Sequence, residues 1–321
     1  MKLAIVSICK NEAKTIQELI KRIPKKIKGV KLIEVIVIND GSTDDTAKLA
    51  KKAGAKVYGD SHSKGLAFRF REAVSIVLEQ GFDAMVNIDG DLQFAPEDIP
   101  MMLAPIIADE ADFVAADRFT DPKKGKRIKT KNMPFVKYHG NKVGAWVVGK
   151  LSEEKFRDVT CGFRAYDQKA LYALNINGTH TYTQESFQLL AARRMRIRSM
   201  PVKVKYFKDR KSRVVTSIPK YMAISLLNIL RAFRDFAPLR FFLLIGTVPF
   251  VLGVICLVFL GVYWLRAQQL SPYKSVGFAG LYLVTLGVFF WALGLVADMQ
   301  VRVLNNQEKT YEALRRLANR K

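Results

Sequence analysis

The stretch AMVNIDGDLQF, residues 84–94, decides the fold of this chain. Its apolar part, residues 84–88, predicts a buried strand, which stops at Asp89, Asp91 and Gln93. These three side chains carry oxygen atoms, the ligand atoms that Mg²⁺ and Mn²⁺ prefer, and such ions are often completed by substrate phosphates. The pattern therefore predicts a metal site at the end of a strand, although Asp-Gly-Asp is equally typical of a plain turn.

The residues before this stretch repeat the same arrangement twice. An apolar run at residues 3–8 is followed by Glu12 and then by apolar residues at helical spacing, and a second run at residues 32–38 ends at Asp40. Alternating strands and helices predict an α/β fold with a mostly parallel sheet, in which ligands bind at the carboxyl ends of the strands. The four carboxylates that follow these strands are therefore expected to converge.

Further elements are expected beyond this core. The stretch at residues 157–166 is interpreted as a compact segment before the next helix. Strands are predicted at residues 56–58, 113–116 and 202–206, and helices at residues 64–79 and 142–151 and from residues 167 and 183 onward.

Two long uncharged runs mark the last third of the chain. They cover residues 241–265 and 275–297, and each meets the length of about 20 apolar residues that crosses a bilayer. Both are apolar on every face, which a core helix of a soluble domain rarely is. We therefore predict two transmembrane helices.

The chain has a net charge of +23, and the positions of its basic residues predict how these helices are oriented. Three arginines lie at positions 231–240 and six lysines or arginines at 302–321, whereas the connecting loop carries only Arg266 and Lys274. This bias places the first domain and both termini in the cytoplasm, with the protein in the cell membrane and attracted to anionic lipids. No nucleic-acid-binding motif is present, and three widely spaced cysteines favour a reducing compartment.

Four parts are expected along the chain. Residues 1–215 form the α/β domain, residues 216–238 an amphipathic helix in the membrane interface, residues 239–300 the two transmembrane helices, and residues 301–321 a basic cytosolic tail. The sequence leaves self-association open.

Several short motifs together resemble a known family. Asn11-Glu12, Asp40-Gly41-Ser42, Lys64-Gly65-Leu66 and the Asp89–Gln93 stretch resemble those of family-2 glycosyltransferases with a GT-A fold. The likeness is strongest to the polyprenyl-phosphate glycosyltransferases typified by dolichyl-phosphate mannose synthase, and it covers residues 1 to about 213. It implies a Rossmann-like GT-A domain followed by the interfacial helix and a two-helix transmembrane hairpin.

The resemblance also implies site residues. It implies Mg²⁺ or Mn²⁺ at Asp89, Asp91 and Gln93, and catalytic roles for Asp91, Arg118 and Arg210. The donor-binding residues that it implies are Ile8, Lys10, Glu12, Ile38, Asp40, Lys64, Asp89, Gly90, Asp91 and Gln93. For the acceptor phosphate it implies Arg118, Lys137, Asn141, Arg164, Arg210, Lys211 and Arg213.

This chain departs from the family at three of these positions. Ile8 and Lys10 stand where Pro and Tyr are usual, and Arg213 stands where Lys is usual. For Arg164, an ion pair with Asp158 or Asp167 is weighed evenly against a phosphate role.

The activity that the resemblance implies is an inverting transfer from GDP-mannose or a UDP-hexose to dolichyl or undecaprenyl phosphate, for cell-envelope glycans or protein glycosylation. A phosphate nucleophile is already ionised at neutral pH, so no strong general base is needed. One alternative is a processive polysaccharide synthase, although its Gln-x-x-Arg-Trp signature is absent. Another is a non-catalytic scaffold that binds nucleotide or lipid, against which the intact acidic motif argues.

Overall fold

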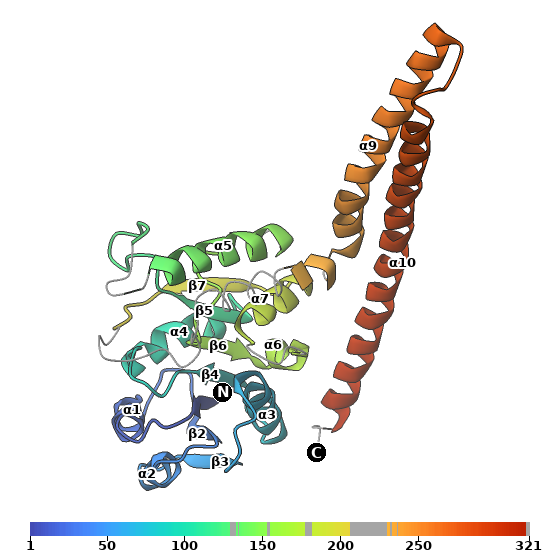
Figure 1. Cartoon of the computed structure of the whole chain (residues 1–321). Helices are drawn as coiled ribbons and strands as arrows, with labels where there is room; N and C mark the ends of the chain where they lie inside the picture. Colours follow the sequence, from blue (N-terminus) through green and yellow to red (C-terminus); the bar gives the residue numbers. More distant parts are fainter. Residues whose placement is uncertain are drawn as a thin grey trace. The chain divides into compact units, whose positions relative to one another are not determined.

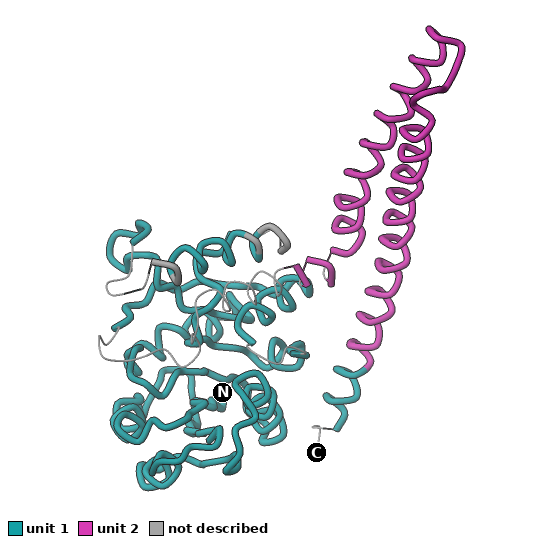
Figure 2. Tube along the Cα trace, in the orientation of Figure 1, with its two compact units in different colours: residues 1–223, 311–321 teal, residues 224–310 magenta. Residues whose placement is uncertain are grey.

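The structure is a computed structural model, in which the chain forms two compact units (Figure 2). Unit 1 comprises residues 1–223 and 311–321, and unit 2 comprises residues 224–310. The residues that the structure describes are 1–128, 133, 135–152, 155–176, 182–205, 230–231, 233–235 and 237–318.

The described part of unit 1 is built on one seven-stranded sheet, with strand order β3-β2-β1-β4-β6-β5-β7 (Figure 1). Strand β6 is antiparallel to β4 and β5, and all other neighbours are parallel. The strands are β1 (Lys2–Cys9), β2 (Leu32–Asp40), β3 (Lys56–Asp60), β4 (Ala84–Asn87), β5 (Phe113–Asp117), β6 (Arg164–Asp167) and β7 (Ile197–Pro201).

Successive side chains of the central strands alternate between two buried layers. In β1, Leu3 and Ile5 face a layer with α1 (Ile16–Arg22), α2 (Thr46–Lys52) and α4 (Ile99–Ile107). Ala4 and Val6 face the other layer, with α3 (Leu66–Glu79), α5 (Phe135–Ser152), α6 (Gln168–Ala173) and α7 (Thr183–Ala192). A 3-10 turn at Pro96–Asp98 precedes α4. A sheet buried on both faces explains why its strands are continuous apolar runs in the sequence.

The expected α/β fold is confirmed, with two corrections to the elements. Residues 164–167 form β6, for which no strand is predicted: it covers the end of the compact stretch at residues 157–166 and Asp167, where a helix was expected to begin. The strand predicted at residues 202–206 is wrong: the strand is β7, five residues earlier, and Val204 makes only an isolated antiparallel bridge with Phe94. β7 is a partly exposed edge strand, so it lacks the apolar run that marks the buried ones.

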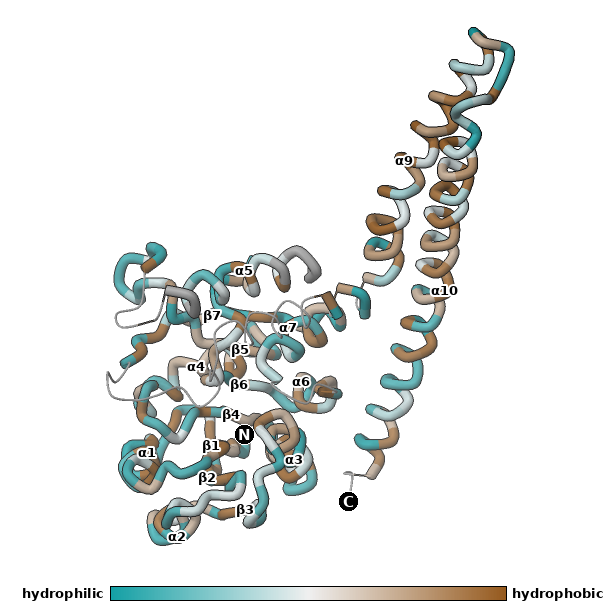
Figure 3. The backbone as a smooth tube through the Cα atoms, in the orientation of Figure 1, coloured by the Kyte–Doolittle hydropathy of each residue, from teal (hydrophilic) through white to brown (hydrophobic). Residues whose placement is uncertain are grey.

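Two helices are long and apolar enough to cross a membrane: α9 (Pro238–Ala267), which lies in unit 2, and α10 (Lys274–Ala318), which lies in unit 2 up to residue 310. They include both predicted spans, and apolar residues predominate along most of α9 and the first half of α10 (Figure 3). α10 continues to residue 318, so most of the predicted tail is helical. The predicted interfacial helix at residues 216–238 lies mostly outside the described residues.

The two helices of unit 2 contact each other through glycines. A Cβ atom on Gly253 would lie 2.6 Å from the carbonyl oxygen of Gly280, and one on Gly246 would lie 2.7 Å from that of Gly287. Such distances are too short for any side chain. Small residues therefore let the two backbones approach closely, as in other packed membrane helices.

Candidate active site

Hydrogen bonds join the loops that follow β1, β2 and β4 into one site. The backbone N–H of Asn11 donates to Oγ of Ser42 (3.0 Å), and Oδ1 of Asn11 accepts from the backbone N–H of Thr43 (2.7 Å). On the other side of β1, Oγ1 of Thr15 donates to the carbonyl oxygen of Gly90 (2.7 Å). β1 pairs with both β2 and β4, so three carboxyl ends meet at one sheet edge.

Two of these loops hold a non-glycine residue in the left-handed region. Asn11 has φ of 56° and Leu92 has φ of 58°. Asn tolerates this conformation, whereas Leu adopts it at a cost of about 1–2 kcal/mol. Such strain is concentrated at functional loops, and Leu92 lies between Asp91 and Gln93 of the predicted metal site.

Asp40 is held by the segment that connects β3 to α3. Its carboxylate accepts from Oγ of Ser63 (2.8 Å), the backbone N–H of Lys64 (2.7 Å) and Nε of Arg69 (3.1 Å). Burial raises the pKa of Asp40, but these hydrogen bonds outweigh it, and the pKa lies below its ordinary value. Asp40 is therefore ionised and orders the turn at Lys64.

Arg69 is a site residue that the sequence did not reveal. Its side chain is fully buried, and besides Asp40 it binds carboxylates of Asp60 (2.8 Å) and Glu72 (2.8 Å). The only signal is its position next to Phe70, on the buried face of a predicted helix. A guanidinium shared among three carboxylates supports the whole β2–α3 side of the site.

The loop after β4 that carries Asp89, Asp91 and Gln93, called the acidic loop here, lies in close contact with Cys9 and Gly162. A Cβ atom on Gly90 would lie 2.6 Å from Sγ of Cys9, so only glycine allows the loop to lie against β1. A Cβ atom on Gly162 would lie 2.8 and 2.9 Å from the two carboxylate oxygens of Asp89. Oδ1 of Asp91 accepts from the backbone N–H of Gln93 (3.0 Å), which folds the loop back on itself.

The side chains of this loop suit a metal ion only if a substrate supplies some of the ligands. Within the described residues, no three His, Cys, Asp or Glu side chains lie close enough to hold a metal by themselves. Asp89 and Asp91 supply two carboxylates, and Gln93 supplies an amide oxygen. Mg²⁺ and Mn²⁺ are commonly held by one or two carboxylates together with substrate phosphates, so this set suits a metal whose coordination a diphosphate completes.

Arg118 and Asn141 lie in one polar network on the other side of the sheet edge. Nε and Nη2 of Arg118 bind the two oxygens of Asp158 (2.6 and 2.9 Å), and Nη2 also donates to Oγ1 of Thr160 (2.8 Å). The Thr160 hydroxyl donates to Oδ1 of Asn141 (2.6 Å). Asn141 is 3 % exposed, and its Nδ2 has no partner among the described residues. The Nδ2 group of Asn141 is therefore a buried donor that a ligand could use.

Asp158 is a second supporting residue that the sequence did not assign. Burial raises its pKa, but the charge of Arg118 outweighs burial and lowers the pKa below its ordinary value. Asp158 therefore stays ionised and pairs with Arg118, so it is not a partner of Arg164.

Arg164 does not form either of the expected ion pairs. Asp167 caps α6, where its carboxylate accepts from the backbone N–H of Ala170 (2.7 Å). The guanidinium of Arg164 is fully buried and donates instead to three backbone carbonyl oxygens.

The other predicted residues occupy varied positions. Glu12 lies beside Gly90, Ile8 is half-buried, Ile38 is in the core, and Lys10 and Lys64 are exposed. Lys137 lies on α5, but its side chain lies outside the described residues, as do Arg210, Lys211 and Arg213. Lys205, the last described residue before these three, lies beside the loop after β4, since its backbone N–H donates to the carbonyl oxygen of Gln93 (2.9 Å).

Two buried cysteines adjoin the site. Burial raises the pKa of Cys9 and of Cys161 to about 12. Both thiols are protonated at neutral pH, so neither supplies a thiolate nucleophile.

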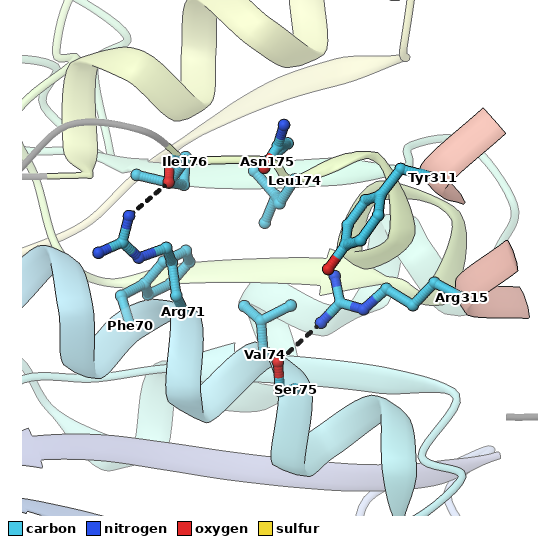
Figure 4. Close-up of a pocket in the computed structure, with 9 residues that line it drawn as sticks. All are labelled: Phe70, Arg71, Val74, Ser75, Leu174, Asn175, Ile176, Tyr311 and Arg315. Carbon is cyan, nitrogen blue, oxygen red and sulfur yellow. Dashed lines mark hydrogen bonds between the residues drawn. The ribbon is translucent and has the colours of Figure 1, made fainter. Parts of the chain in front are cut away.

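A separate hollow in unit 1 lies between α3 and the residues that follow α6 (Figure 4). Arg71 reaches across it to the carbonyl oxygen of Ile176 (3.0 Å), and Arg315 donates to Oγ of Ser75 (3.0 Å). No predicted site residue lines it.

A three-layer α/β/α domain with a mostly parallel mixed sheet and carboxylates after β1, β2 and β4 has the GT-A fold of glycosyltransferases. Glucosyl-3-phosphoglycerate synthase from Mycobacterium tuberculosis, solved with Mn²⁺, UDP-glucose and phosphoglyceric acid, shares this fold, with a TM-score of 0.55 and 18% identity over 71% of this chain and 79% of that one. The chain belongs to glycosyl transferase family 2, whose profile matches residues 4–174. It is therefore a glycosyltransferase.

Two archaeal relatives extend the comparison. A UDP-N-acetylglucosamine–dolichyl-phosphate N-acetylglucosaminyltransferase of Methanococcus voltae is 28% identical over 176 residues, or 50% of this chain and 68% of the relative. Glycosyltransferase AglJ of Haloferax volcanii is 26% identical over 308 residues, or 95% of both chains. The second match includes the two apolar helices.

Proposed function

We propose that this glycosyltransferase moves a sugar from a nucleotide-sugar to a polyprenyl phosphate at the membrane surface. The observation that carries the proposal is the presence of two membrane-length apolar helices on the same chain as a family-2 domain. The M. voltae relative, named for a dolichyl-phosphate acceptor, supports it. A lipid acceptor requires the catalytic domain to stay at a bilayer.

The donor binds along the joined loops after β1, β2 and β4. Glu12 and Asp40 lie on the nucleoside side, and Asp89, Asp91 and Gln93 lie where the diphosphate is expected. Asp89, Asp91 and Gln93 would hold a Mg²⁺ or Mn²⁺ ion, which would supply positive charge for the leaving diphosphate. The M. tuberculosis enzyme of the same fold, which was solved with Mn²⁺ and UDP-glucose, supports this assignment.

The acceptor phosphate binds on the side of Arg118 and Asn141. Asp158 neutralises and orients Arg118, and the Nδ2 group of Asn141 donates to a phosphate oxygen. An oxygen of the acceptor phosphate attacks the anomeric carbon of the donor sugar. The bond between this carbon and the donor diphosphate breaks, and the nucleoside diphosphate leaves with the electron pair. The stereochemistry inverts, and Lys137, Arg210, Lys211 and Arg213 are proposed to add positive charge.

The test is transfer of radiolabelled sugar from GDP-mannose, UDP-glucose and UDP-N-acetylglucosamine into an organic-extractable lipid. Purified chain, polyprenyl phosphate and Mg²⁺ or Mn²⁺ are incubated together. One donor is expected to give a labelled lipid, and Asp91→Asn is expected to lower the rate about 100-fold or more, since it removes a metal-binding charge.

Glu110→Gln is the matched control, because Glu110 is an exposed carboxylate just before β5, at the edge of the sheet opposite to the carboxyl ends of the strands. It is expected to retain the wild-type rate. Absence of transfer from all three donors to dolichyl and undecaprenyl phosphate, with folded protein and metal present, would contradict the proposal.

A further inference from the structure

A cluster of buried polar side chains lies beneath the metal-binding loop. It consists of Asn87 on β4, Arg164 on β6 and Tyr182 just before α7, each no more than 2% exposed. Asn87 and Arg164 stand opposite each other in the antiparallel β4–β6 pair. Neither contacts solvent, so neither is placed to touch a substrate directly.

The buried guanidinium of Arg164 is held by backbone carbonyl oxygens and not by a carboxylate, and its Nη1 has no hydrogen-bond partner among the described residues. Its Nε donates to the carbonyl oxygen of Cys161 (2.7 Å), and its Nη2 donates to those of Val159 (3.1 Å) and Thr183 (2.8 Å). The guanidinium also lies 4.9 Å from the ring centre of Phe187. Burying a guanidinium is costly, so the three hydrogen bonds that offset part of this cost hold the backbone carbonyl groups in place.

Asn87 holds the next carbonyl group of the same loop. Its Nδ2 donates to the carbonyl oxygen of Gly162 (2.8 Å) and to the hydroxyl oxygen of Tyr182 (2.8 Å). Between them, Asn87 and Arg164 bind the carbonyl groups of residues 159, 161 and 162. Hydrogen bonds from Asn87 and Arg164 therefore fix the orientation of the backbone at residues 159–162.

The opposite face of this loop meets the predicted metal ligand. The Cα atom of Gly162 lies so close to Asp89 that a Cβ atom would fall within 3 Å of both carboxylate oxygens. Any shift of residues 159–162 toward the site would therefore displace the Asp89 carboxylate. Asn87 and Arg164 thus each bind residues 159–162 by hydrogen bonds, and these residues in turn contact Asp89.

We propose that Asn87 and Arg164 are positioning residues for the metal: they hold Asp89 in its binding orientation through the backbone of residues 159–162. This inference deepens the proposed function and rests on its assignment of Asp89 as a metal ligand. Loss of groups that orient a metal ligand typically lowers metal affinity 10–100-fold. Asn87 and Arg164 are thus expected to affect metal affinity although they never touch the metal.

The experiment measures Mn²⁺ affinity of the full-length detergent-solubilised chain by EPR, with and without UDP or GDP, alongside the Mn²⁺ dependence of sugar transfer. The variants are Asn87→Leu and Arg164→Lys. Lysine keeps the charge, but its three N–H donors lie on one nitrogen and cannot span the positions of Nε and Nη2 of Arg164. Both variants are expected to raise the Mn²⁺ dissociation constant about tenfold and to recover transfer at high Mn²⁺.

Met85→Leu is the matched control. Met85 is equally buried on β4, two residues before Asn87, and its side chain carries no hydrogen-bond donor. It is expected to keep wild-type Mn²⁺ affinity whatever its effect on stability.

Gly162→Ala gives a second route if the buried variants fail to fold, as judged by circular dichroism. It presses on Asp89 from the loop side and is expected to weaken Mn²⁺ binding similarly. Wild-type Mn²⁺ affinity in folded Asn87→Leu, Arg164→Lys or Gly162→Ala, with an active wild type, would overturn the inference and leave the proposed function intact. A wild type with neither Mn²⁺ binding nor transfer would overturn both.

Discussion

Asp167 is a carboxylate whose ionised form the fold disfavours. Burial, reinforced by the charge of Asp112, raises its pKa to about 6, while the hydrogen bond from Ala170 opposes the rise. An unfolded chain releases this proton near pH 3.9. The folded state therefore binds the proton more tightly, and between about pH 4 and pH 6 this group makes stability fall as the pH rises.

Asp167→Asn is expected to remove this penalty while keeping the helix cap, since Asn and Asp cap equally well. The full shift corresponds to about 3 kcal/mol at 1.36 kcal/mol per pH unit, and partial exposure reduces the expected gain at pH 7.5 to about 1 kcal/mol. Thermal midpoints of wild type and variant at pH 4.5 and pH 7.5 test it. An equal difference at both pH values would contradict it.

Asn141 supports a second prediction at the scale of one atom. Asn141→Asp keeps the oxygen that accepts from Thr160 but replaces the unpartnered N–H donor group with a second oxygen. An anionic phosphate is then repelled, so the KM for polyprenyl phosphate is expected to rise tenfold or more, whereas the KM for the donor stays near its wild-type value.

Gln80→Glu makes the same change of charge on an exposed side chain after α3 and is expected to leave both constants unchanged. Equal effects of the two substitutions would assign the effect to overall charge and contradict a role for Asn141.

Sequence reasoning found the polar residues at the strand ends but not the ones that hold them. A carboxylate after an apolar run is visible in the sequence, as at Asp40 and Asp89. The partners Arg69 and Asp158 lie 29 and 40 residues from Asp40 and Arg118, respectively. Such pairs are set by tertiary packing, which no local pattern records.

At the scale of elements, β6 shows why prediction failed locally. It has four residues, begins with a buried arginine and ends at the cap of α6, so neither its length nor its pattern indicates a strand. Its partners β4 and β5 lie far earlier in the chain. The long buried strands β1 and β2, by contrast, were predicted because burial on both faces leaves a continuous apolar run.

The glycines between α9 and α10 give a prediction at this scale. In Gly253→Leu the new side chain would meet the backbone of Gly280 and Val284, which cannot move aside as a flexible side chain can. Overpacking of this kind costs about 1–3 kcal/mol, so the thermal midpoint in detergent is expected to fall.

Gly261→Leu is the control on the same helix, since nothing lies within 4 Å of a Cβ atom there. It is expected to leave the midpoint unchanged. A midpoint lowered equally by both substitutions would mean that helix propensity, and not contact between the helices, determines the effect.

At the scale of the whole molecule, charge predicts how the chain crosses the membrane. Basic residues flank the outer ends of the two helices, and the hairpin loop carries only Arg266 and Lys274. A cysteine placed at Gln269 is expected to react with a membrane-impermeant maleimide in intact cells. One placed at Asn306 is expected to react only after permeabilisation, and the reverse pattern would contradict cytoplasmic termini.

The division of the chain into an α/β part and a helical hairpin could be predicted, because composition changes sharply near residue 240. That residues 311–321 belong to unit 1 could not be predicted from the sequence. It depends on contacts such as the ion pair between Arg193 and Glu312 (2.7 Å), whose members lie 119 residues apart.

The antiparallel insertion of β6 between β4 and β5 has a consequence for the order of events during synthesis. The ribosome delivers β1 to β4, with the loops for the donor, before the chain that forms β6 exists. A nascent chain can therefore complete the proposed donor-binding half early, whereas residues 159–162, which are proposed to orient Asp89, follow about 70 residues later and depend on a long-range pairing. Competence for metal binding is thus expected to arise late, as the sheet closes.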